Sequence, residues 1–167
     1  MSKRDLHVAV YTGSFDPITL GHLNVIQRCS RLVDRLVIGI GVNIDKESLF
    51  TTEERMELVQ RVTAGLDNVE VKSFCGLAVE FVRACNARVM IRGVRSLSDM
   101  EAEFTMSLAN QKLDPDVETV FLMAGEEYSH VSSSLIKQIA SMAGEDELLR
   151  FVPRPVAKAL RDKLGSP

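Results

Sequence analysis

Short apolar runs alternate with helical patterns along the 167 residues of the chain, and this alternation limits the fold more than any other feature. The runs predict strands, and the segments between them carry apolar residues three or four positions apart, which is typical of helices. No hairpin turn joins two runs, so each strand is expected to reach the next through a helical crossover. The predicted strands are residues 6–12, 35–42, 69–74, 88–91 and 117–123, and the predicted helices are residues 21–33, 52–63, 77–86, 98–112, 132–142, 145–151 and 153–164.

Helical crossovers between consecutive strands give a parallel sheet, and such crossovers are right-handed. The run at residues 35–42 is apolar almost throughout, which indicates a central strand buried on both faces. We therefore expect an α/β fold, a single Rossmann-like domain over residues 1–167 with a five-stranded parallel sheet flanked by helices. The C-terminal helices, from about residue 145, are expected to pack on this domain.

The composition excludes several classes of function. The formal net charge is −3, whereas proteins that bind nucleic acid broadly carry a strongly basic surface, so any anion site must be a local cluster of Lys and Arg. No apolar stretch approaches the roughly 20 residues that span a bilayer, and no signal-type apolar core follows the first residues. Cys29, Cys75 and Cys85 form no CxxC motif, which favours reduced thiols over disulfides or zinc. We expect a cytoplasmic protein that binds neither nucleic acid nor a membrane.

The segment after the first predicted strand has the composition of a phosphate-binding turn. Gly13-Ser14 and Asp16-Pro17 break the strand, because Gly tolerates positive φ and Pro fixes φ. Thr19-Leu20-Gly21-His22 then opens a helix, whose N-terminal N–H groups and dipole favour anions. The segment lacks both the GxxxxGK[ST] pattern of a P-loop and the glycine spacing of a dinucleotide fingerprint. His22 stands where a P-loop has its lysine.

Residues suited to phosphate follow the other predicted strands as well. In parallel sheets the ligand lies beyond the carboxyl ends of the strands, at the switch in strand order. Lys46 follows the second strand, and Arg92-Gly93-Val94-Arg95 follows the fourth; guanidinium groups suit phosphate oxygens, and the glycine allows the backbone to approach a ligand. Ser132-Ser133-Ser134 opens a helix and supplies hydroxyl and N–H groups to a polyphosphate. Taken singly, each of these residues also suits a capping or solvated role, so the prediction depends on their convergence.

The sequence shows no metal-ligand cluster and no Ser-His-Asp arrangement with a GxSxG turn. What it offers is a histidine, several cations, a serine-rich helix start and glycine turns, with no obvious nucleophile or general base. Such a set suits phosphoryl or nucleotidyl transfer, in which the protein positions groups and stabilises charge. We therefore expect one of the substrates to supply the nucleophile. The sequence does not identify which residues would bind a metal.

Several motifs resemble those of a known family. Thr19-Leu20-Gly21-His22 matches the (H/T)xGH motif of the nucleotidyltransferase superfamily. The second motif of that superfamily is similar to Ser132-Ser133-Ser134-Leu135-Ile136-Lys137, with Lys137 in place of Arg. Together with further segments, these motifs resemble the bacterial phosphopantetheine adenylyltransferase family over roughly residues 8 to 137, at a matching total length. The further segments are Gly13-Ser14-Phe15-Asp16-Pro17-Ile18, Phe50-Thr51-x-Glu53-Glu54-Arg55, Ile91-Arg92-Gly93-x-Arg95 and Val120-Phe121-Leu122-Met123.

The resemblance implies a nucleotidyltransferase that reversibly transfers AMP from ATP to 4′-phosphopantetheine. The products are dephospho-coenzyme A and pyrophosphate, in the penultimate step of coenzyme A biosynthesis. The substrate phosphate attacks the α-phosphorus of ATP in line, without a covalent enzyme intermediate, and Mg²⁺ is required. Members of the family are typically homohexamers and are often inhibited by coenzyme A.

The resemblance also implies roles for individual residues. His22 would donate to the α-phosphate as charge develops there, and Ser14 would hold the attacking phosphate. Lys46 and Arg92 would bind the phosphopantetheine phosphate and the transition state. The implied catalytic residues are therefore Ser14, His22, Lys46 and Arg92. The implied ATP-binding residues are Ser14, Phe15, His22, Gly93, Val94, Arg95, Glu103, Tyr128, Ser129, His130, Val131, Ser132, Ser133 and Ser134, and the implied substrate-binding residues are Ser14, Lys46, Leu77, Ala78, Arg92 and Asn110.

The chain departs from the family pattern at a few positions. The family often has Thr where Ser14 stands, which keeps the hydroxyl, and Pro where Thr12 and Ala124 stand, which bears on the stiffness of those two loops. The (H/T)xGH motif alone leaves open another nucleotidyltransferase, with nicotinamide mononucleotide or glycerol phosphate as its substrate. Outside the enzymes, the alternative is a non-catalytic nucleotide-binding module, which would bind ATP without turnover.

Overall fold

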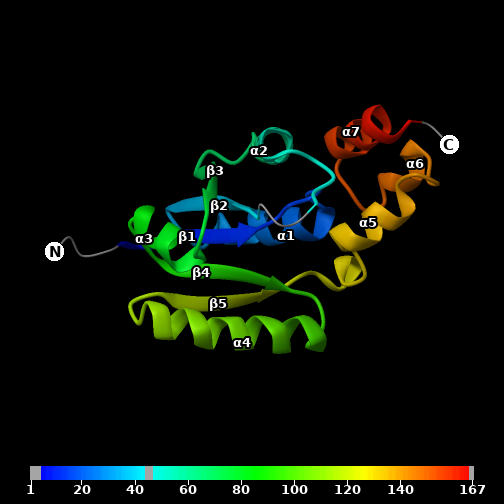
Figure 1. Cartoon of the computed structure of the whole chain (residues 1–167). Helices are drawn as coiled ribbons and strands as arrows, with labels where there is room; N and C mark the ends of the chain where they lie inside the picture. The colour runs from blue at the N-terminus through cyan, green and yellow to red at the C-terminus, as the bar shows by residue number, and fades with distance from the viewer. Residues whose placement is uncertain (1–4, 44–46, 166–167) are drawn as a thin grey trace.

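The computed structural model describes residues 5–43 and 47–165, which form a parallel sheet with helices on both faces (Figure 1). The order of the strands is β3-β2-β1-β4-β5, and every neighbouring pair is parallel. The predicted five-stranded parallel sheet of a Rossmann-like fold is therefore confirmed. The strands are β1 (Asp5–Gly13), β2 (Arg35–Val42), β3 (Val69–Cys75), β4 (Ala87–Val94) and β5 (Glu118–Met123), and the α-helices are α1 (Leu20–Cys29), α2 (Thr52–Thr63), α3 (Ala78–Ala84), α4 (Leu97–Leu113), α5 (Ser133–Ile139), α6 (Glu145–Leu148) and α7 (Arg154–Leu164).

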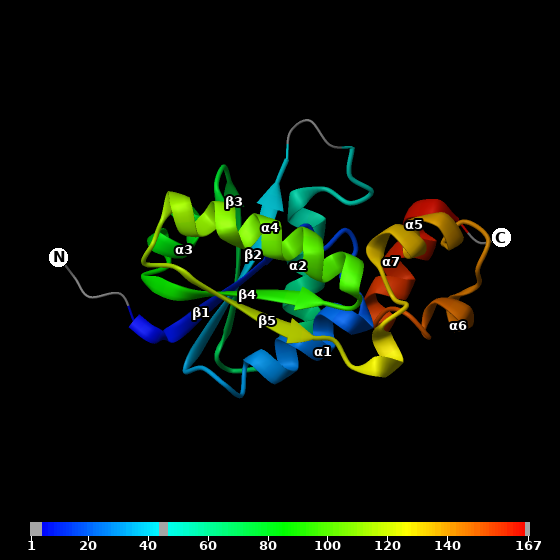
Figure 2. The same ribbon diagram turned by 90° about the horizontal axis from the view of Figure 1, so that it is seen from below.

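The order of the strands reverses at β1. From β1 the chain forms β2 after α1 and β3 after α2, both on one side of β1. After α3 it forms β4, and after α4 it forms β5, both on the other side of β1. Right-handed crossovers place the helices of two such halves on opposite faces. Accordingly, α1 and α2 cover one face, whereas α3 and α4 cover the other (Figure 2). The carboxyl ends of β1 and β4 therefore border a crevice, the position at which open α/β sheets bind ligands.

The side chains of β2 show how the sheet is buried. Leu36, Ile38 and Ile40 join the apolar cluster that includes α1 and α2, whereas Val37 joins the cluster that includes α3. Successive side chains of a strand point to opposite faces of the sheet, so apolar side chains of β2 are covered on both. The prediction that residues 35–42 form a central strand buried on both faces is confirmed.

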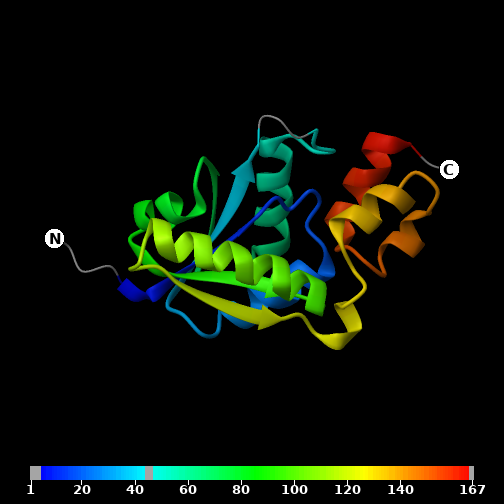
Figure 3. The same ribbon diagram turned by 60° about the horizontal axis from the view of Figure 1, so that its bottom comes forward.

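The C-terminal helices extend the first of these apolar clusters. They group together beside the carboxyl ends of the strands (Figure 3). Ile136 of α5, Leu148 of α6 and Leu160 of α7 are buried in the same cluster as side chains of α1 and α2. The Leu20 N–H at the start of α1 donates to the Phe151 carbonyl at 2.9 Å, which ties α1 to the segment between α6 and α7. None of the helices in the two described ranges is both long and apolar enough to cross a membrane.

One predicted helix is shorter than the sequence pattern indicates. The helix predicted over residues 21–33 ends at Cys29. Residues 30–33 form a turn instead, and the side-chain amide of Asn68 donates to two carbonyl oxygens of this turn, at 2.8 and 3.0 Å. These carbonyl groups obtain partners from a distant residue rather than from a further helical turn, a contact that the local pattern does not indicate. The helix predicted over residues 52–63, by contrast, has the predicted bounds, and Thr51 is its N-cap.

The strand β4 is longer than predicted, and this changes the setting of the arginines. The strand predicted over residues 88–91 continues to Val94, which pairs with Met123 of β5. Arg92 and Gly93 therefore lie within the end of a strand rather than in a loop after it. A Cβ atom at Gly93 would lie 2.9 Å from the Tyr11 hydroxyl oxygen, so the glycine permits close packing against β1. The remaining helices and strands begin and end within three residues of the predicted bounds.

Candidate functional site

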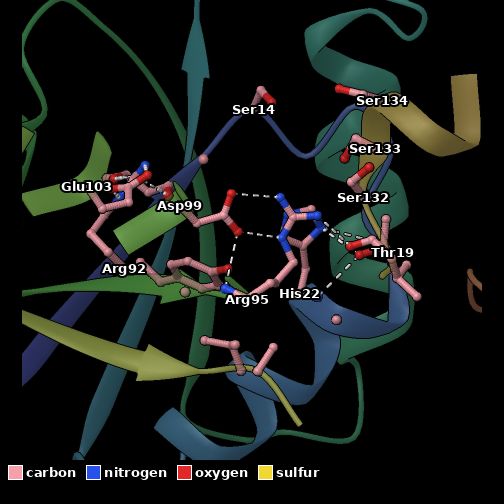
Figure 4. A pocket seen from close by; sticks show the side chains of 18 residues that line it. Ser14, Thr19, His22, Arg92, Arg95, Asp99, Glu103, Ser132, Ser133 and Ser134 are labelled. Carbon is pink, nitrogen blue, oxygen red and sulfur yellow. Dashed lines mark hydrogen bonds and ion pairs between the residues drawn. The ribbon is translucent and has the colours of Figure 1, made fainter. Parts of the chain in front are cut away.

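A cavity of about 270 Å³ opens where β1 and β4 end, at the reversal of the strand order (Figure 4). It lies at the carboxyl ends of the strands, where the sequence predicts the ligand. Side chains converge on it from the turn after β1, from the start of α1, from the end of β4 with α4, and from the start of α5. The lining residues are Tyr11, Thr12, Gly13, Ser14, Thr19, Gly21, His22, Val25, Arg92, Gly93, Arg95, Asp99, Glu103, Ala124, Val131, Ser132, Ser133 and Ser134.

The first turn of α1 fixes the imidazole ring of His22. The Thr19 N–H donates to Nδ1 of His22 at 3.1 Å, and the Thr19 hydroxyl accepts a hydrogen bond from the His22 N–H at 3.3 Å. This arrangement is a capping box in which histidine takes the place of the usual Glu or Gln. A backbone N–H can only donate, so Nδ1 is the acceptor and the proton of the neutral ring lies on Nε2. His22 therefore offers the cavity an N–H donor.

The environment keeps the His22 ring uncharged at neutral pH. Burial, followed by the positive charges of Arg95 and Arg92, lowers the pKa of His22 from 6.5 to about 4. The ring also packs edge-on against Phe15, with 5.1 Å between the ring centroids. A neutral donor next to two cations suits a ligand that carries negative charge, because it adds a hydrogen bond without adding a further buried charge.

Arg92 is held by other groups of the protein. Its Nε and Nη2 atoms each donate to a carboxylate oxygen of Glu103 at 2.6 Å. Its Nη1 atom donates to the carbonyl and hydroxyl oxygens of Thr12 at 2.7 and 2.9 Å. Burial lowers the pKa of Arg92, but the hydrogen bonds and charge of Glu103 outweigh this effect and raise that pKa above its ordinary value. Arg92 and Glu103, which the resemblance assigns to substrate and to ATP, are thus brought together and bind each other.

Arg95 is paired in a similar way with Asp99, a residue that the sequence reasoning missed. The Nε and Nη2 atoms of Arg95 donate to the two carboxylate oxygens of Asp99 at 2.9 and 3.2 Å, and Nη1 donates to the Val131 carbonyl at 2.8 Å. Asp99 lines the cavity beside Arg95 (Figure 4). The spacing of Arg95, Asp99 and Glu103 is four residues at each step, which would place the two carboxylates on one side of a helix. That spacing is the signal that could have identified Asp99.

The serine segment at the start of α5 serves the protein as well as the cavity. Ser132 is the N-cap, and its hydroxyl accepts from the Leu135 N–H at 3.0 Å. The Ser133 hydroxyl donates to the Pro17 carbonyl at 2.8 Å, which joins α5 to the turn after β1. Ser134 is exposed, and within the described ranges its hydroxyl makes no hydrogen bond. The prediction that these hydroxyls face a polyphosphate therefore applies most directly to Ser134.

Phe15 lies beside the cavity, but its side chain does not line it. The ring is 1% exposed and packs edge-on against Tyr11, with 5.4 Å between the ring centroids. The backbone of Phe15 has a φ of 46°, in the left-handed region. Any contact between Phe15 and a ligand must therefore involve the backbone of the turn rather than the aromatic ring.

Other predicted site residues lie away from the lining of this cavity. Leu77 is the exposed N-cap of α3, directly before Ala78. Val94 is buried, and Asn110 is buried with its Nδ2 atom 3.7 Å from the Met90 sulfur. Lys46 falls outside the described residues. The residues Tyr128, Ser129 and His130 form the end of a 3₁₀ turn and the segment that leads to Val131.

The turn after β1 is held from two further directions through Asp16. The Asp16 carboxylate accepts hydrogen bonds from the N–H groups of Leu49 and Phe50 at 2.8 and 2.9 Å. It also forms an ion pair with Lys137 of α5 at 2.6 Å. Burial alone would raise the pKa of Asp16, but these contacts lower it below its ordinary value. Asp16 therefore links the turn to the loop before α2 and to α5, in keeping with the structural role that its place in the turn suggests.

A second cavity, of about 430 Å³, lies between α2 and α7. Its lining includes an ion pair of Lys163 with Glu54, at 2.7 Å, and none of the predicted site residues that the structure describes. The chemistry suited to phosphate is thus concentrated in the first cavity.

Comparison with known proteins points to one family. The sequence pattern of the cytidylyltransferase-like family matches residues 10–139. A protein named phosphopantetheine adenylyltransferase from Rhodopirellula baltica is 60% identical over 161 residues, which cover 96% of this chain and 90% of that protein. A protein of the same name from Clostridium botulinum (strain Eklund 17B) is 53% identical over 139 residues, which cover 83% of this chain and 87% of that protein.

A solved structure supports the fold. The bifunctional NMN adenylyltransferase/ADP ribose pyrophosphatase of Francisella tularensis, complexed with AMP and a manganese ion, aligns with a TM-score of 0.65 at 12% identity. The alignment covers 93% of this chain and 49% of that protein. At this identity the likeness concerns the fold alone.

Proposed function

Because this chain belongs to the phosphopantetheine adenylyltransferase family, within the cytidylyltransferase-like proteins, we propose that its cavity reversibly transfers AMP from ATP to 4′-phosphopantetheine. The products are dephospho-coenzyme A and pyrophosphate. The chain is thus an enzyme of the nucleotidyltransferase class. The observation that carries the assignment of this reaction to the cavity is the neutral His22 donor, fixed by Thr19 beside two arginines at the reversal of strand order.

The proposed reaction needs no general base from the protein. The phosphate of phosphopantetheine is already anionic and can attack the α-phosphorus of ATP directly. As the new bond forms and the bond to pyrophosphate breaks, negative charge grows on the oxygens around the α-phosphorus. The Nε2–H of His22 would donate to one of these oxygens, and such a donor stabilises the transition state more than the ground state. The capping box holds the ring in place before the substrates arrive.

The arginines and Ser14 would hold the phosphates. Arg95 uses three of its five N–H donors on described groups of the protein, so it retains donors for a nucleotide. Arg92 uses four of its five N–H donors on Glu103 and Thr12, so one N–H remains, and any second contact with the phosphopantetheine phosphate requires an exchange of partners. Ser14 is exposed at the rim of the cavity (Figure 4), and its hydroxyl is proposed to bind the attacking phosphate. Lys46 is proposed to assist Arg92, on the strength of the resemblance.

Nucleotidyltransferases of this family use a divalent metal, which we propose is Mg²⁺. Among the described residues, no group of three or more His, Cys, Asp and Glu side chains is placed to hold a metal ion. The carboxylates that line the cavity, Asp99 and Glu103, are paired with arginines. These residues do not fit a metal site built by the protein. The ion is instead proposed to arrive with the nucleotide, since Mg²⁺ binds readily to substrate phosphates and keeps several waters.

The test is a comparison of substrate pairs. The protein is incubated with ATP and 4′-phosphopantetheine, with ATP and nicotinamide mononucleotide, and with CTP and glycerol phosphate, and pyrophosphate release is measured. The proposal expects release with the first pair alone, and mass spectrometry should then detect dephospho-coenzyme A. Turnover of only the nicotinamide or glycerol substrate would overturn the substrate assignment. Binding of ATP without any turnover would instead favour a non-catalytic module.

We also propose that the chain forms a homo-oligomer, which the resemblance identifies as a homohexamer. The support comes from α4 and the adjacent strand β5 (Figure 1), which expose large apolar side chains. An exposed apolar patch of this kind marks an interaction surface. The exposed residues are Leu97, Phe104, Met106, Leu108 and Leu113 on α4, and Val120 and Met123 on β5. Analytical ultracentrifugation tests the proposal, and a monomer at micromolar concentration would refute it.

Regulation and location are proposed on narrower grounds. Coenzyme A consists of the product dephospho-coenzyme A with one further phosphate, so we expect it to enter the same cavity and to act as a feedback inhibitor. Competition between coenzyme A and phosphopantetheine in the pyrophosphate assay tests this proposal. Cys29, Cys75 and Cys85 are unpaired, which supports a cytoplasmic location.

A further inference from the structure

Arg55, in the first turn of α2, is a buried cation that the proposed chemistry does not use. The residue is 3% exposed. Its Nη1 atom donates to the Ser14 carbonyl at 2.8 Å and to the Gly41 carbonyl at 3.2 Å, and its Nη2 atom donates to the Thr52 hydroxyl at 3.1 Å. The guanidinium therefore joins α2 to the turn after β1 and to the end of β2.

The partners of Arg55 are all uncharged. They are carbonyl and hydroxyl oxygens, and within residues 5–43 and 47–165 no carboxylate pairs with this guanidinium. Arg92 and Arg95, by contrast, each face a carboxylate. A buried charge without a counterion destabilises a protein unless it is well hydrogen-bonded, and an apolar side chain of similar volume is often tolerated better. A cation at this position therefore calls for an explanation beyond packing.

The bond to Ser14 fixes one peptide plane at the rim of the cavity. In a trans peptide the C=O and the following N–H point in opposite directions. Because the Ser14 carbonyl points toward Arg55, the Phe15 N–H points away from it. In the described part of the chain this N–H donates to no other group. The Phe15 ring also helps to hold this peptide in place, because the ring is buried against Tyr11 and His22.

We propose that Arg55 is a positioning residue for the adenylyl-transfer site, because it fixes the Ser14–Phe15 peptide so that the Phe15 N–H is available to a bound phosphate. Its uncompensated positive charge adds to the field that attracts anions to the turn. If Arg55 is removed, the Ser14 carbonyl loses its partner and the peptide is free to rotate. A carbonyl oxygen turned toward the phosphate would repel it. The inference rests on the proposed function, since the activity that it concerns is adenylyl transfer.

Kinetics of substituted proteins give the first test. Arg55→Met removes the charge and the donors, and kcat is expected to fall about 10- to 100-fold, because a misplacement of about 1 Å in an active site has an effect of this size. The KM for ATP is expected to change less than kcat, since the nucleotide keeps its contacts with α4 and α5. Arg55→Lys keeps the charge but cannot reproduce the forked geometry, so its kcat should lie between those of Arg55→Met and the unsubstituted protein, and more than about threefold below the latter. Arg61→Met, a control on the exposed side of the same helix, should leave kcat unchanged.

Amide NMR gives the second test. If Arg55 had a purely structural role, its removal would leave the response of the Phe15 amide to a phosphate ligand unchanged. Only two of the seven phenylalanines follow a serine, Phe15 and Phe74. Labelling with ¹³C-carbonyl serine and ¹⁵N-phenylalanine therefore selects these two amide signals, of which Phe74 in β3 is the internal control. Titration with inorganic pyrophosphate is expected to shift the Phe15 signal of the unsubstituted protein. The shift should be at least about fivefold smaller in Arg55→Met, and in Arg55→Lys if Arg55→Met does not fold.

The outcomes separate this inference from the proposed function. If the unsubstituted protein fails to make dephospho-coenzyme A, the proposed function fails, while the pyrophosphate titration still tests Arg55. If the unsubstituted protein is active and Arg55→Lys keeps kcat within about threefold, the inference fails. It also fails if pyrophosphate shifts the Phe15 signal equally with and without Arg55.

Discussion

The two sides of the cavity differ in how they are prepared for a ligand. On the side of the β1–α1 turn, the protein holds the backbone and the His22 ring through contacts with Thr19, Asp16 and Arg55. On the side of β4 and α4, the cations Arg92 and Arg95 are paired with carboxylates of the same protein. On the first side the His22 ring is uncharged and held in place by hydrogen bonds, whereas the arginines on the second side are charged and already bonded to carboxylates.

This difference suggests a division of tasks. A donor that is already in place needs no rearrangement when charge develops in the transition state, so the turn side suits catalysis. Where an arginine gives up a carboxylate contact to bind a phosphate, it gains only the difference between the two interactions, so the arginine side suits binding that is reversible. Such a division would allow the site to bind the two proposed, highly charged substrates and still release the products.

The largest expected effect is on the turn side. His22→Ala removes the proposed donor to the α-phosphate, and we expect kcat to fall about 10³-fold, as for the loss of an oxyanion donor elsewhere. The dissociation constant for ATP should change little, because the contact strengthens mainly in the transition state. Pyrophosphate release and equilibrium binding of ATP measure the two quantities, and His7→Ala, at an exposed site outside the cavity, is the control. A near-normal kcat in His22→Ala would show that the turn side does not supply the catalytic donor.

Arg92→Ala is the matching test on the arginine side. We expect kcat/KM for phosphopantetheine to fall about 100-fold, with KM contributing much of the loss, because the proposed charge-assisted contact to the substrate phosphate is removed. The variant also leaves the Glu103 carboxylate without its partner, so some loss of thermal stability should accompany it. Arg88→Ala, on the same strand but bonded to the exposed Asp116 carbonyl, is the control. Unchanged kinetics would remove Arg92 from the site.

Asp99→Asn tests whether the internal ion pairs compete with ligand. The substitution weakens the hold on Arg95, so the affinity for inorganic pyrophosphate is expected to rise about threefold to tenfold, in line with the loss of a partly exposed ion pair worth about 1 kcal/mol. Isothermal titration calorimetry measures the affinity. Weaker binding in this variant would mean that Asp99 supports the bound state rather than opposing it. Asp67→Asn, in the exposed turn before β3, serves as the control.

The last test concerns stability as a function of pH. The pKa of His22 is about 4 in the folded protein and near 6.5 when the chain is unfolded. Between these values the unfolded chain binds a proton that the folded chain does not, so His22 makes stability decrease as the pH falls from about 6.5 to about 4. His22→Gln should show a smaller decrease in Tm over this range. Equal slopes of Tm against pH would show that His22 titrates normally.

The turn side was largely predictable from the sequence, because its determinants are local. Gly13, Pro17 and the Thr19–His22 spacing specify a strand, a turn and a helix start within a few residues of one another. The arginine side was less predictable. The extension of β4 to Val94 depends on pairing with β5, and the partners of Arg92 and Arg95 come from another element, α4.

Arg55 shows a further limit of prediction from sequence. In the sequence it follows two glutamates at the start of a helix and resembles an ordinary charge on a solvated face. It is buried because the turn after β1 and the end of β2 both lie against the start of α2, where their carbonyl groups accept from Arg55. This arrangement depends on the order of the strands. The contacts that support the site are therefore tertiary, even where the residues proposed to perform the chemistry can be predicted from short motifs.

The turn side is proposed to present a fixed, uncharged donor to the reacting phosphate. Two-dimensional ¹H–¹⁵N NMR of the imidazole nitrogens tests it directly, and the chain has only three histidines to assign. For His22 at pH 7 we expect a proton on Nε2, an unprotonated Nδ1, and no titration until the pH approaches about 4. A His22 ring that carries its proton on Nδ1, or that becomes charged near pH 6.5, would contradict the account.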